Sequence, residues 1–475
     1  MMSGLFFCCD KTYTSPQRHV TPLHDTTTSF STTDGYSNID EEPQNCHKKP
    51  TSVHLYRNTW HLIKHGDLQA AFLSIHYDDR RIDTEHTQLR FTVTSNVRLN
   101  DGILTTMVWY RDKQCAVELS RCTFDLTADN FVNGNHSINK NFMHKGYAVT
   151  CDLPFGNSHV DIAPEFASVI AKSSPIHDST HITNLAPILH PLPLNQNYTD
   201  SIGVCASNLY GKFTLNDTYL FINWMESLLM FGVKEVTMNN LSLIVEHTLT
   251  ARMFEHYTGS GVLKLHNYST NMPDLTIKPR FSNRGDDLAL QNAVLNKCLH
   301  DNRLRYWFAL ILDWDEIVVP QSDNKQSTYA DILTKISAAT KIPKYRPESK
   351  KNVMPACSHY YQSRLERNNA QPVYLPMLQP AQAFRSEKNT CKSFQNPRLC
   401  GFAGIHTCDK FVGARSASVL HLHRRHMLTH HYRNSCKHAR LCHRRVHDDN
   451  ELYTSHGQRL RQRVESVLNA LQHSV

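Results

Sequence analysis

The sequence predicts a two-part α/β protein, in which a smaller β-sandwich precedes a doubly wound, mostly parallel sheet. Three observations point to this fold class. Short strand patterns fill residues 51–175, strand and helix patterns alternate after residue 201, and a continuous apolar run spans 306–312. A chain of 475 residues with 40% hydrophobic content can supply more than one core.

The composition excludes several classes of protein. Lys and Arg number 51 against 43 Asp and Glu, a net charge of +8, and charged residues make up 20% of the chain. This excess is too mild for a basic nucleic-acid scaffold or a polyelectrolyte tail. The 17 glycines and 20 prolines argue against a fibrous or low-complexity protein. A folded, multidomain protein remains.

The first segment, residues 1–50, has the composition of a flexible stalk. It is rich in Thr, Ser, Asp, Asn and His and lacks apolar periodicity. Its apolar start, Leu5–Cys9, is far shorter than the roughly twenty residues of a membrane-spanning helix, and no later run is long enough. We therefore expect a membrane anchor to be absent from this chain or truncated.

Cysteines and glycosylation sequons favour a secretory lumen. The 14 cysteines include no Cys-x-x-Cys pair, so a zinc module is not indicated. The nearest spacings suit either local disulfides or separate buried thiols; they are Cys115/Cys122, Cys400/Cys408 and Cys436/Cys442. Sequons stand at Asn135, Asn197, Asn216, Asn240 and Asn267. Together these features are typical of an oxidising compartment.

Residues 51–175 have the texture of a β-sandwich. Short apolar or alternating runs separated by polar turns predict several successive strands. They are Ala71–Ile75, Leu89–Val93, Leu104–Tyr110, Cys115–Leu119 and Tyr147–Cys151. Residues 176–200 contain three prolines, Pro187, Pro191 and Pro193, and are expected to be a linker.

From residue 201 the chain predicts strands that alternate with helices. The strands are expected at Val204–Ser207, Lys234–Met238, Val262–Leu265 and Tyr306–Leu312, and the helices at Asp217–Phe231, Ile244–Tyr257 and Asp286–His300. The last strand is apolar throughout, as in a strand covered on both faces. This β-α-β-α-β-α-β succession predicts a parallel sheet in a domain spanning 201–440.

Two carboxylates follow the last apolar strand. Asp313 and Asp315 belong to an Asp-Trp-Asp-Glu sequence at its carboxyl end, where ligands bind in parallel sheets. A solvated turn is the simpler interpretation of such a motif by itself, but its place in the β/α series favours a site. Carboxylate oxygens suit Mn²⁺ or Mg²⁺, which can bridge to a nucleotide diphosphate. Phosphate-binding Gly-rich motifs are absent from the sequence.

Residues 204 to about 433 resemble glycosyltransferase family 92, once catalogued as domain of unknown function 23. The matching segments, in order, are 204–211 (VCASNLYG), 221–226 (FINWME), 231–233 (FGV), 291–299 (QNAVLNKCL), 307–320 (WFALILDWDEIVVP), 396–398 (NPR), 404–406 (GIH) and 430–433 (HHYR). The resemblance implies a GT-A fold, a nucleotide-sugar donor such as UDP-galactose, a divalent cation and inversion at the anomeric carbon. It also implies residence in the Golgi lumen and association with its membrane, and the β-rich region resembles the domain that precedes the catalytic domain in this family.

The resemblance also implies site residues. Asp313 and Asp315 fall on the metal-binding aspartates of the family, and His406 and His431 fall on histidines that can complete the metal site. Further positions match and are donor-pocket candidates, although the first of them can equally cap or pair within a helix: Glu226, Gln291, Asn296, Lys392 and Arg398. Lys392 or Arg398 would contact the diphosphate.

An inverting transfer needs a base that takes the proton of the acceptor hydroxyl. Glu316 lies beside the metal pair, and Glu366 lies downstream together with Glu348 and Glu387. The sequence leaves the choice among these carboxylates open. Ile317 also departs from the aromatic residue common in the family after the acidic run.

The C-terminal region is rich in histidine and arginine. We interpret residues 421–447 as a basic, partly solvated surface; a transition-metal patch and an RNA-binding segment are the alternatives. Residues 441–475 predict an amphipathic helix, with apolar Leu460, Val464, Val467, Leu468 and Leu471. We expect it to dock on the catalytic domain, the alternative being a membrane surface.

The predicted function is metal-dependent transfer of a hexose, galactose by resemblance, to a glycan on a glycoprotein or glycolipid. The alternative is a catalytically inactive carbohydrate-binding or scaffold protein with the same fold. A nucleic-acid partner is not expected, because aromatic stacking residues are sparse among the C-terminal basic residues.

Overall fold

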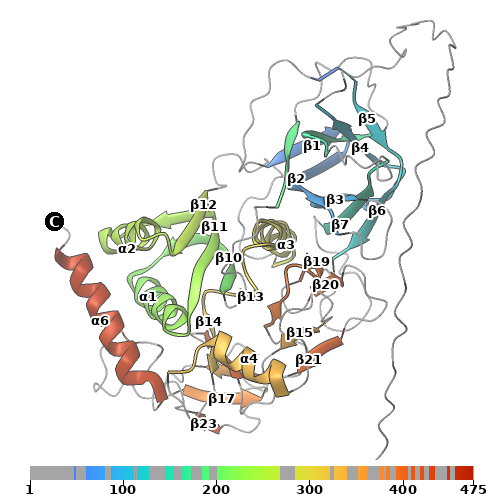
Figure 1. Cartoon of the computed structure of the whole chain (residues 1–475). Coiled ribbons are helices and arrows are strands. Elements are labelled where there is room, and N and C mark those ends of the chain that lie inside the picture. The colour runs from blue at the N-terminus through green and yellow to red at the C-terminus, as the bar shows by residue number, and fades with distance from the viewer. Residues whose placement is uncertain are drawn as a thin grey trace, which may run out of the picture. The chain divides into compact units, whose positions relative to one another are not determined.

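A computed structural model of the chain gives the arrangement of its elements (Figure 1). The structure describes residues 48–49, 60–80, 87–111, 113, 115–127, 145–154, 163–172, 184–191, 201–267, 284–320, 326–339, 351–354, 356–361, 375, 377, 381–385, 392–404, 408–411, 418–421, 427–433, 447–449 and 455–473. These residues form a mixed α/β protein with several sheets, and Asn45–Val475 make up one compact unit.

The N-terminal part is a β domain. Its strands are β1 (His61–His65), β2 (Leu68–Asp78), β3 (Gln88–Ser95), β4 (Leu104–Trp109), β5 (Val117–Leu119), β6 (Cys122–Leu126), β7 (Lys145–Asp152), β8 (Phe166–Ala171) and β9 (Ala186–Leu189). They pair in the order β5-β4-β8-β9-β2-β3-β7-β6, with β1 on β2. Side chains from both ends of this path share one core. The strands thus form one continuous hydrogen-bonded path around a single core.

The segment expected to be a linker contributes to this sheet. β9 lies within residues 176–200 and pairs with β2 and β8. Pro187 is accommodated in β9, where it is the register partner of Phe166. One cysteine pair differs from the sequence spacing, because Cys122 bonds Cys151 on the neighbouring strand rather than Cys115, whereas the predicted spacing Cys400/Cys408 is a local disulfide.

The second sheet carries the predicted β/α succession. Its elements are β10 (Ile202–Phe213), α1 (Leu215–Met230), β11 (Val233–Val245), α2 (Thr248–Gly259), β12 (Leu263–Asn267), α3 (Arg284–Asp301) and β13 (Phe308–Leu312). The strand order is β12-β11-β10-β13-β18-β15-β21, and β12, β11, β10 and β13 are parallel. β10 and β11 are longer than predicted because they stay paired as far as Phe213 and Val245. For the same reason α2 begins at Thr248, after the predicted Ile244.

Helices cover both faces of the four parallel strands. Val204 and Leu310 point into the larger core with α1 and α2, whereas Cys205 and Ile311 pack with α3. The disulfide between Cys205 and Cys298 ties β10 to α3 directly. Figure 1 shows α1 and α2 on one side of these strands and α3 on the other.

The remaining described elements follow β13. They are β14 (Glu316–Pro320), α4 (Tyr329–Ala339), β15 (Lys351–Met354), β16 (Ala356–Tyr361), β17 (Ala381–Arg385), β18 (Phe394–Gln395), β19 (Cys400–Ala403), β20 (Cys408–Phe411), β21 (Ser418–His421), β22 (Met427–Arg433), β23 (His447–Asp449) and α6 (Gly457–His473). A third sheet has the order β14-β22-β16-β17-β23, and β19 pairs with β20. The Cys400–Cys408 disulfide joins that last pair.

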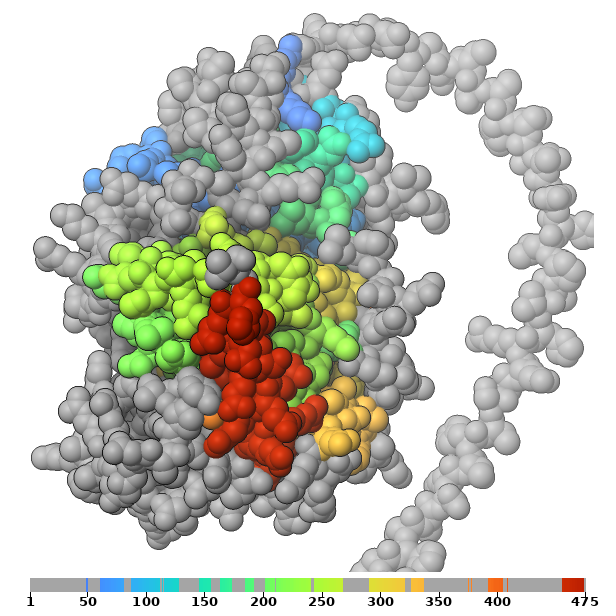
Figure 2. All heavy atoms as spheres, turned by 90° about the vertical axis from the view of Figure 1, so that its left-hand side faces the viewer, coloured from blue at the N-terminus to red at the C-terminus, as the bar shows by residue number. Residues whose placement is uncertain are grey.

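Local sequence explains where the helices begin, end and dock. Thr214 and Asp217 form a reciprocal capping box at the start of α1. Gly232, with a φ of 88°, follows the end of that helix. α6 buries Leu460, Val464 and other apolar side chains in the core that it shares with α1 and α2. Figure 2 shows α6, in red, lying beside the green segments that include these helices.

The β domain packs on α3 through a buried charge cluster. The Asp78 side chain is 1% exposed and accepts hydrogen bonds from Arg80, Arg90 and Arg303. Arg80 Nη1 also donates to the carbonyl oxygens of Pro397, Arg398 and Cys400, at 2.9–3.1 Å. Burial alone would raise the pKa of Asp78, but the three guanidinium groups hold it far below its ordinary value. One carboxylate therefore joins β2 to Arg303, just after α3, and, through Arg80, to the segment 397–400.

Within the described ranges, no helix has the length and apolar character needed to cross a membrane.

Replacement of Gly203 by Ala should destabilise the parallel sheet. A Cβ at this position would lie 2.6 Å from Cδ2 of Tyr306, a side chain that is only 5% exposed. We expect Gly203→Ala to lower the free energy of unfolding by about 1–3 kcal/mol in urea titrations. The matched control is Gly259→Ala at the end of α2, where no atom lies within 4 Å of the added Cβ. An equal loss in both variants would contradict the packing argument.

Replacement of Asp78 by Asn should weaken the protein at neutral pH. Three buried guanidinium groups would lose a charged partner, which we expect to lower the free energy of unfolding by about 3–5 kcal/mol. Because the folded-state pKa is depressed, this contribution is present above about pH 4 and fades as the pH falls further. Urea titrations should therefore show the wild type and Asp78→Asn converging in acid.

The control for Asp78 is Glu165→Gln, which weakens an ion pair with Arg111, a side chain that is 84% exposed. Its effect should stay below about 1 kcal/mol. A difference between wild type and Asp78→Asn that does not depend on pH would contradict the charge argument.

Candidate functional site

The candidate site lies where the strand order reverses. β11 and β12 lie on one side of β10, and β13, the next strand along the chain, lies on its other side. Parallel strands present their carboxyl ends at one edge, and ligands of such sheets bind where the order reverses. The chain leaves β13 at this edge and enters the Asp313–Glu316 turn, closed by a hydrogen bond from Glu316 N to Asp313 O.

An ammonium group links the carboxylates of this turn. Lys392 Nζ lies 2.9 Å from Asp313 Oδ2 and 3.2 Å from Glu316 Oε2. Glu316 Oε2 also accepts the backbone N–H of Asp313 at 3.1 Å. From α3, Gln291 Nε2 donates to Asp313 Oδ1 at 3.2 Å. Three predicted site residues thus meet around Asp313. Gln291 and Lys392 were predicted for the donor pocket, and Glu316 was a candidate for the base.

Burial and charge act in opposite directions on Lys392. The residue is 1% exposed, and burial alone would lower the pKa of its ammonium group. The charges of Asp313 and Glu316, together with their hydrogen bonds, outweigh burial and raise this pKa above its ordinary value. Lys392 is therefore a fixed positive charge over the working pH range of a protein.

The turn is positioned by aromatic residues. Trp224 Nε1 of α1 donates to the Glu316 carbonyl at 2.6 Å. Trp314 packs on Phe213, with ring centroids 5.4 Å apart. The Asp313 side chain stays 25% exposed, and Asp315 is partly buried. These contacts hold the turn in place while Asp313 and Asp315 both stay partly exposed.

The other predicted metal ligands are only partly described. His431 is described by its backbone in β22, where it is the register partner of Glu316. Register partners in antiparallel strands have Cα atoms about 4.5–5.5 Å apart, so this position adjoins the turn. His406 and Glu366 lie outside the described residues. Among the residues that are described, no three His, Cys, Asp or Glu side chains are grouped as a metal site.

Two donor-pocket candidates, Asn296 and Arg398, make hydrogen bonds that hold neighbouring segments of the protein together. Asn296 accepts from Ala403 N at 2.7 Å and donates to Ala403 O at 3.1 Å, which holds β19 on α3. The backbone of Arg398 is fixed by Asn396 and by Arg80 of the β domain. Both residues therefore support the segment that follows Lys392.

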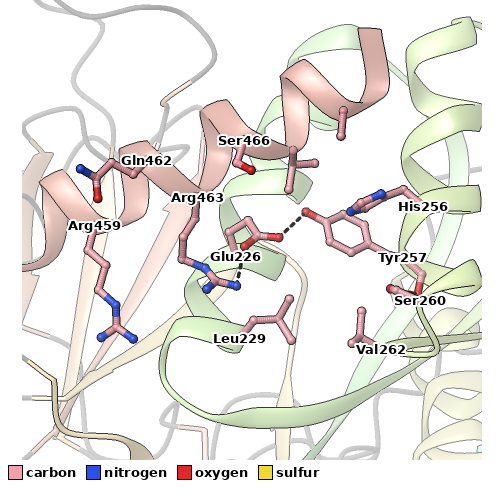
Figure 3. A pocket seen from close by; sticks show the side chains of 12 residues that line it. Glu226, Leu229, His256, Tyr257, Ser260, Val262, Arg459, Gln462, Arg463 and Ser466 are labelled. Carbon is pink, nitrogen blue, oxygen red and sulfur yellow. Dashed lines mark hydrogen bonds and ion pairs between the residues drawn. The ribbon is translucent and has the colours of Figure 1, made fainter. Parts of the chain in front are cut away.

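Glu226 belongs to a different place from the Asp313 turn. It lies in a pocket of about 520 Å³ between α1, α2 and α6 (Figure 3). Tyr257 donates to Glu226 Oε1 at 3.0 Å, and Arg463 Nη2 lies 2.8 Å from Oε2. Burial and the Glu226 carboxylate raise the pKa of Tyr257. The structure thus shows Glu226 pairing with neighbouring helices, the alternative that the sequence left open.

Sequence reasoning did not single out two buried asparagines near the turn. Asn208 of β10 and Asn239 of β11 are register partners, 5% and 2% exposed. On β11 the same face also carries the buried polar residues Glu235 and Thr237. Asn239 therefore does not stand out in the strand pattern, and the asparagine pair becomes visible only once the strands are placed side by side.

Comparison with known proteins gives a family. The family model described as "Glycosyltransferase family 92" matches residues 200–474, more than half of the chain. A search among curated proteins finds no match. A similar solved structure is titled "WbbM bifunctional glycosytransferase apo structure"; the match has 13% identity, covers 32% of this chain and 24% of that one, and has a TM-score of 0.16. On the extent of the family match, the chain belongs to glycosyltransferase family 92.

Proposed function

We propose that this protein transfers a hexose from a nucleotide-sugar donor to a glycan, with inversion at the anomeric carbon, and that the hexose is galactose. Membership of a glycosyltransferase family gives the reaction type. The observation that carries the proposal further is the Asp313 turn with Lys392 at the carboxyl end of β13. It offers carboxylates for a cation and an ammonium for a diphosphate in one place.

We assign the second sheet to a GT-A-like, doubly wound arrangement. The strand order β12-β11-β10-β13 reverses at β10, and helices cover both faces of these strands. Those two properties define the doubly wound class, in which a nucleotide lies beyond the strand ends at the reversal. The arrangement supports a donor site at the Asp313 turn.

The donor atoms of the turn fit a divalent cation. Mg²⁺ and Mn²⁺ are commonly held by one or two carboxylates together with substrate phosphates. Asp313 is partly exposed and Asp315 lies two residues on, so these two side chains would hold Mn²⁺ or Mg²⁺, with His431 and His406 as further candidates. When bound, such a cation would neutralise negative charge on the leaving diphosphate.

Lys392 has a complementary role in this proposal. Its ammonium already pairs with Asp313 and Glu316, so a bound cation and Lys392 would share the charge of one carboxylate. A diphosphate beside Asp313 would give Lys392 a second anionic partner. The Gln291 amide would keep Asp313 oriented.

The identity of the base is narrowed by burial. Glu316 is 4% exposed and paired with Lys392, which disfavours it as the group that receives the proton of an acceptor hydroxyl. Glu366, Glu348 and Glu387 lie outside the described residues and remain the sequence candidates. We propose that the base is one of them.

We place the reaction in the Golgi lumen, with a glycan of a glycoprotein or glycolipid as acceptor and no nucleic-acid partner. Three disulfides among the described residues support an oxidising compartment. The alternative is a carbohydrate-binding protein without activity. The Lys392–Asp313 ion pair would favour it if Lys392 occupied the place of the cation at Asp313.

Asp313→Asn and Asp315→Asn should each lower galactose transfer about 100-fold or more. Loss of cation ligands removes several kcal/mol of charge stabilisation at the diphosphate. Release of UDP from UDP-galactose with Mn²⁺ and a glycan panel measures the effect. Asp331→Asn, an exposed capping residue of α4, is the control and should keep wild-type activity. Wild-type rates in both turn variants would contradict the cation site at Asp313 and Asp315, whereas a wild-type protein that releases no UDP would support the inactive alternative.

Lys392→Met should destabilise the protein more at pH 7 than at pH 5. Glu316 would lie buried beside Asp313 without a cation, so its folded-state pKa would rise above the ordinary value of about 4.3. A raised carboxyl pKa penalises the folded state at high pH, and the penalty fades as the pH falls. Urea titrations should show a loss of about 3 kcal/mol at pH 7 and a smaller loss at pH 5.

Lys212→Met provides the control for Lys392. This lysine pairs with Glu246 on the surface and is 69% exposed, so we expect a much smaller change in the free energy of unfolding than for Lys392→Met at either pH. Equal losses for Lys392→Met at both pH values would show that the ammonium charge is not what matters.

A further inference from the structure

Three polar side chains lie in a row across adjacent parallel strands. β13 pairs with β10 as far as Ala206 and Leu312, and Asp313 is the next residue after that pair. Beyond an irregularity in β10, Asn208 is the register partner of Asn239 on β11. The row Asp313, Asn208 and Asn239 therefore crosses the carboxyl-end region of β13, β10 and β11.

The row faces α3. In β11, Val236 and Met238 point into the core with α1 and α2, so the alternating position Asn239 points to the other face. In β10, Leu209 belongs to that same core, which places the preceding Asn208 on the face of Asn239. Asp313 contacts Gln291 of α3. All three side chains thus lie on the side of the sheet that α3 covers.

The two asparagines have polar atoms without a hydrogen-bond partner. Oδ1 of Asn208 and Nδ2 of Asn239 are both buried and unpaired. An unsatisfied buried group costs about 1–3 kcal/mol, so proteins rarely retain one without a reason. By contrast, Asn296 on α3 bonds at both ends of its amide. One acceptor and one donor therefore remain unmatched on neighbouring strands beside the proposed diphosphate position.

We propose that Asn208 and Asn239 hydrogen-bond the nucleoside half of the nucleotide-sugar donor. This inference rests on the proposed function, since it takes the diphosphate to lie at Asp313. Adjacent strands are about 4.8 Å apart, so Asn208 and Asn239 lie one and two strand spacings from β13. A nucleoside is covalently joined to the diphosphate, and its base edge and ribose hydroxyls offer paired donors and acceptors. Such a ligand matches one free acceptor and one free donor.

Removing either amide should not destabilise the unliganded protein, which is unusual for a buried polar residue. Leu is close to Asn in size but has no polar atoms, so Asn208→Leu and Asn239→Leu remove an unsatisfied group from the unliganded protein. Replacing buried unsatisfied polar groups by apolar groups of similar shape is nearly neutral or stabilising. We expect the melting temperature without ligand to stay equal or rise in both variants, while binding of the nucleoside weakens.

Calorimetric titration of the full chain with UDP, uridine and ribose 5-phosphate tests the inference. Each variant should bind UDP and uridine about 10-fold more weakly than wild type, the size of one lost hydrogen bond. If the asparagines bind the nucleobase, the affinity for ribose 5-phosphate should not change in the variants. If they bind the ribose, the affinity for ribose 5-phosphate should fall together with that for UDP.

Asn184→Leu is the matched control. Asn184 is a buried amide of the β domain that bonds Ser168 and the carbonyl oxygens of Leu62 and Val169. This variant should melt at a lower temperature and bind UDP as wild type does. A fall in melting temperature for Asn208→Leu and Asn239→Leu like that of Asn184→Leu, with unchanged UDP affinity, would overturn the inference.

The outcomes separate this inference from the proposed function. Wild-type transfer of galactose together with undiminished uridine binding in both variants would remove the nucleoside assignment and leave the function intact. Wild type that neither binds UDP nor releases it from UDP-galactose would remove both.

Discussion

The buried ammonium of Lys392 is the interaction on which the candidate site depends. It joins the Asp313–Glu316 turn to the segment that enters β18, at distances of 2.9 and 3.2 Å. The Ile311 N–H bonds the Ser393 carbonyl beside it, so backbone and charge fix the same junction. Two acidic residues can stay ionised side by side because this cation lies between them.

The β domain contributes to the same junction from the other side of α3. Asp78 binds Arg303 just after α3 and holds Arg80, which reaches the carbonyl oxygens of Pro397, Arg398 and Cys400. An apolar contact adds to it, because Trp60 and Leu73 pack on Leu290 and Val294 of α3. The β domain therefore braces the segment that carries Lys392, in addition to any role in recognising a glycan.

Local sequence patterns predicted the β/α succession because each element carries its own signal. The apolar run before Asp313, the helical spacing around Phe221 and the glycine after α1 need no long-range information. The full length of β10 and β11 could not be predicted this way, since their pairing beyond Ala206 decides it. β9 was missed because three prolines suggested a linker, and only its partners β2 and β8 make it a strand.

The position of the candidate site could be predicted from the sequence, but only part of the residues that meet there could be. Asp313 and Asp315 follow a recognisable strand, whereas the Lys392–Glu316 pair joins positions that no spacing rule connects. Glu226 matched the family by position, yet its contacts with Tyr257 and Arg463 place it under α6. Asn208 and Asn239 became visible through their missing partners, a property that exists only in the folded protein.

The most direct measurement of the central claim is a crystal structure of the protein with UDP and Mn²⁺, in which anomalous scattering locates the metal. The account predicts a manganese peak at about 2.0–2.2 Å from a carboxylate oxygen of the Asp313–Glu316 turn, with the diphosphate beside Lys392. A nucleotide bound instead in the pocket under α6, or an Asp313 turn unchanged and without metal at saturating ligand, would contradict it.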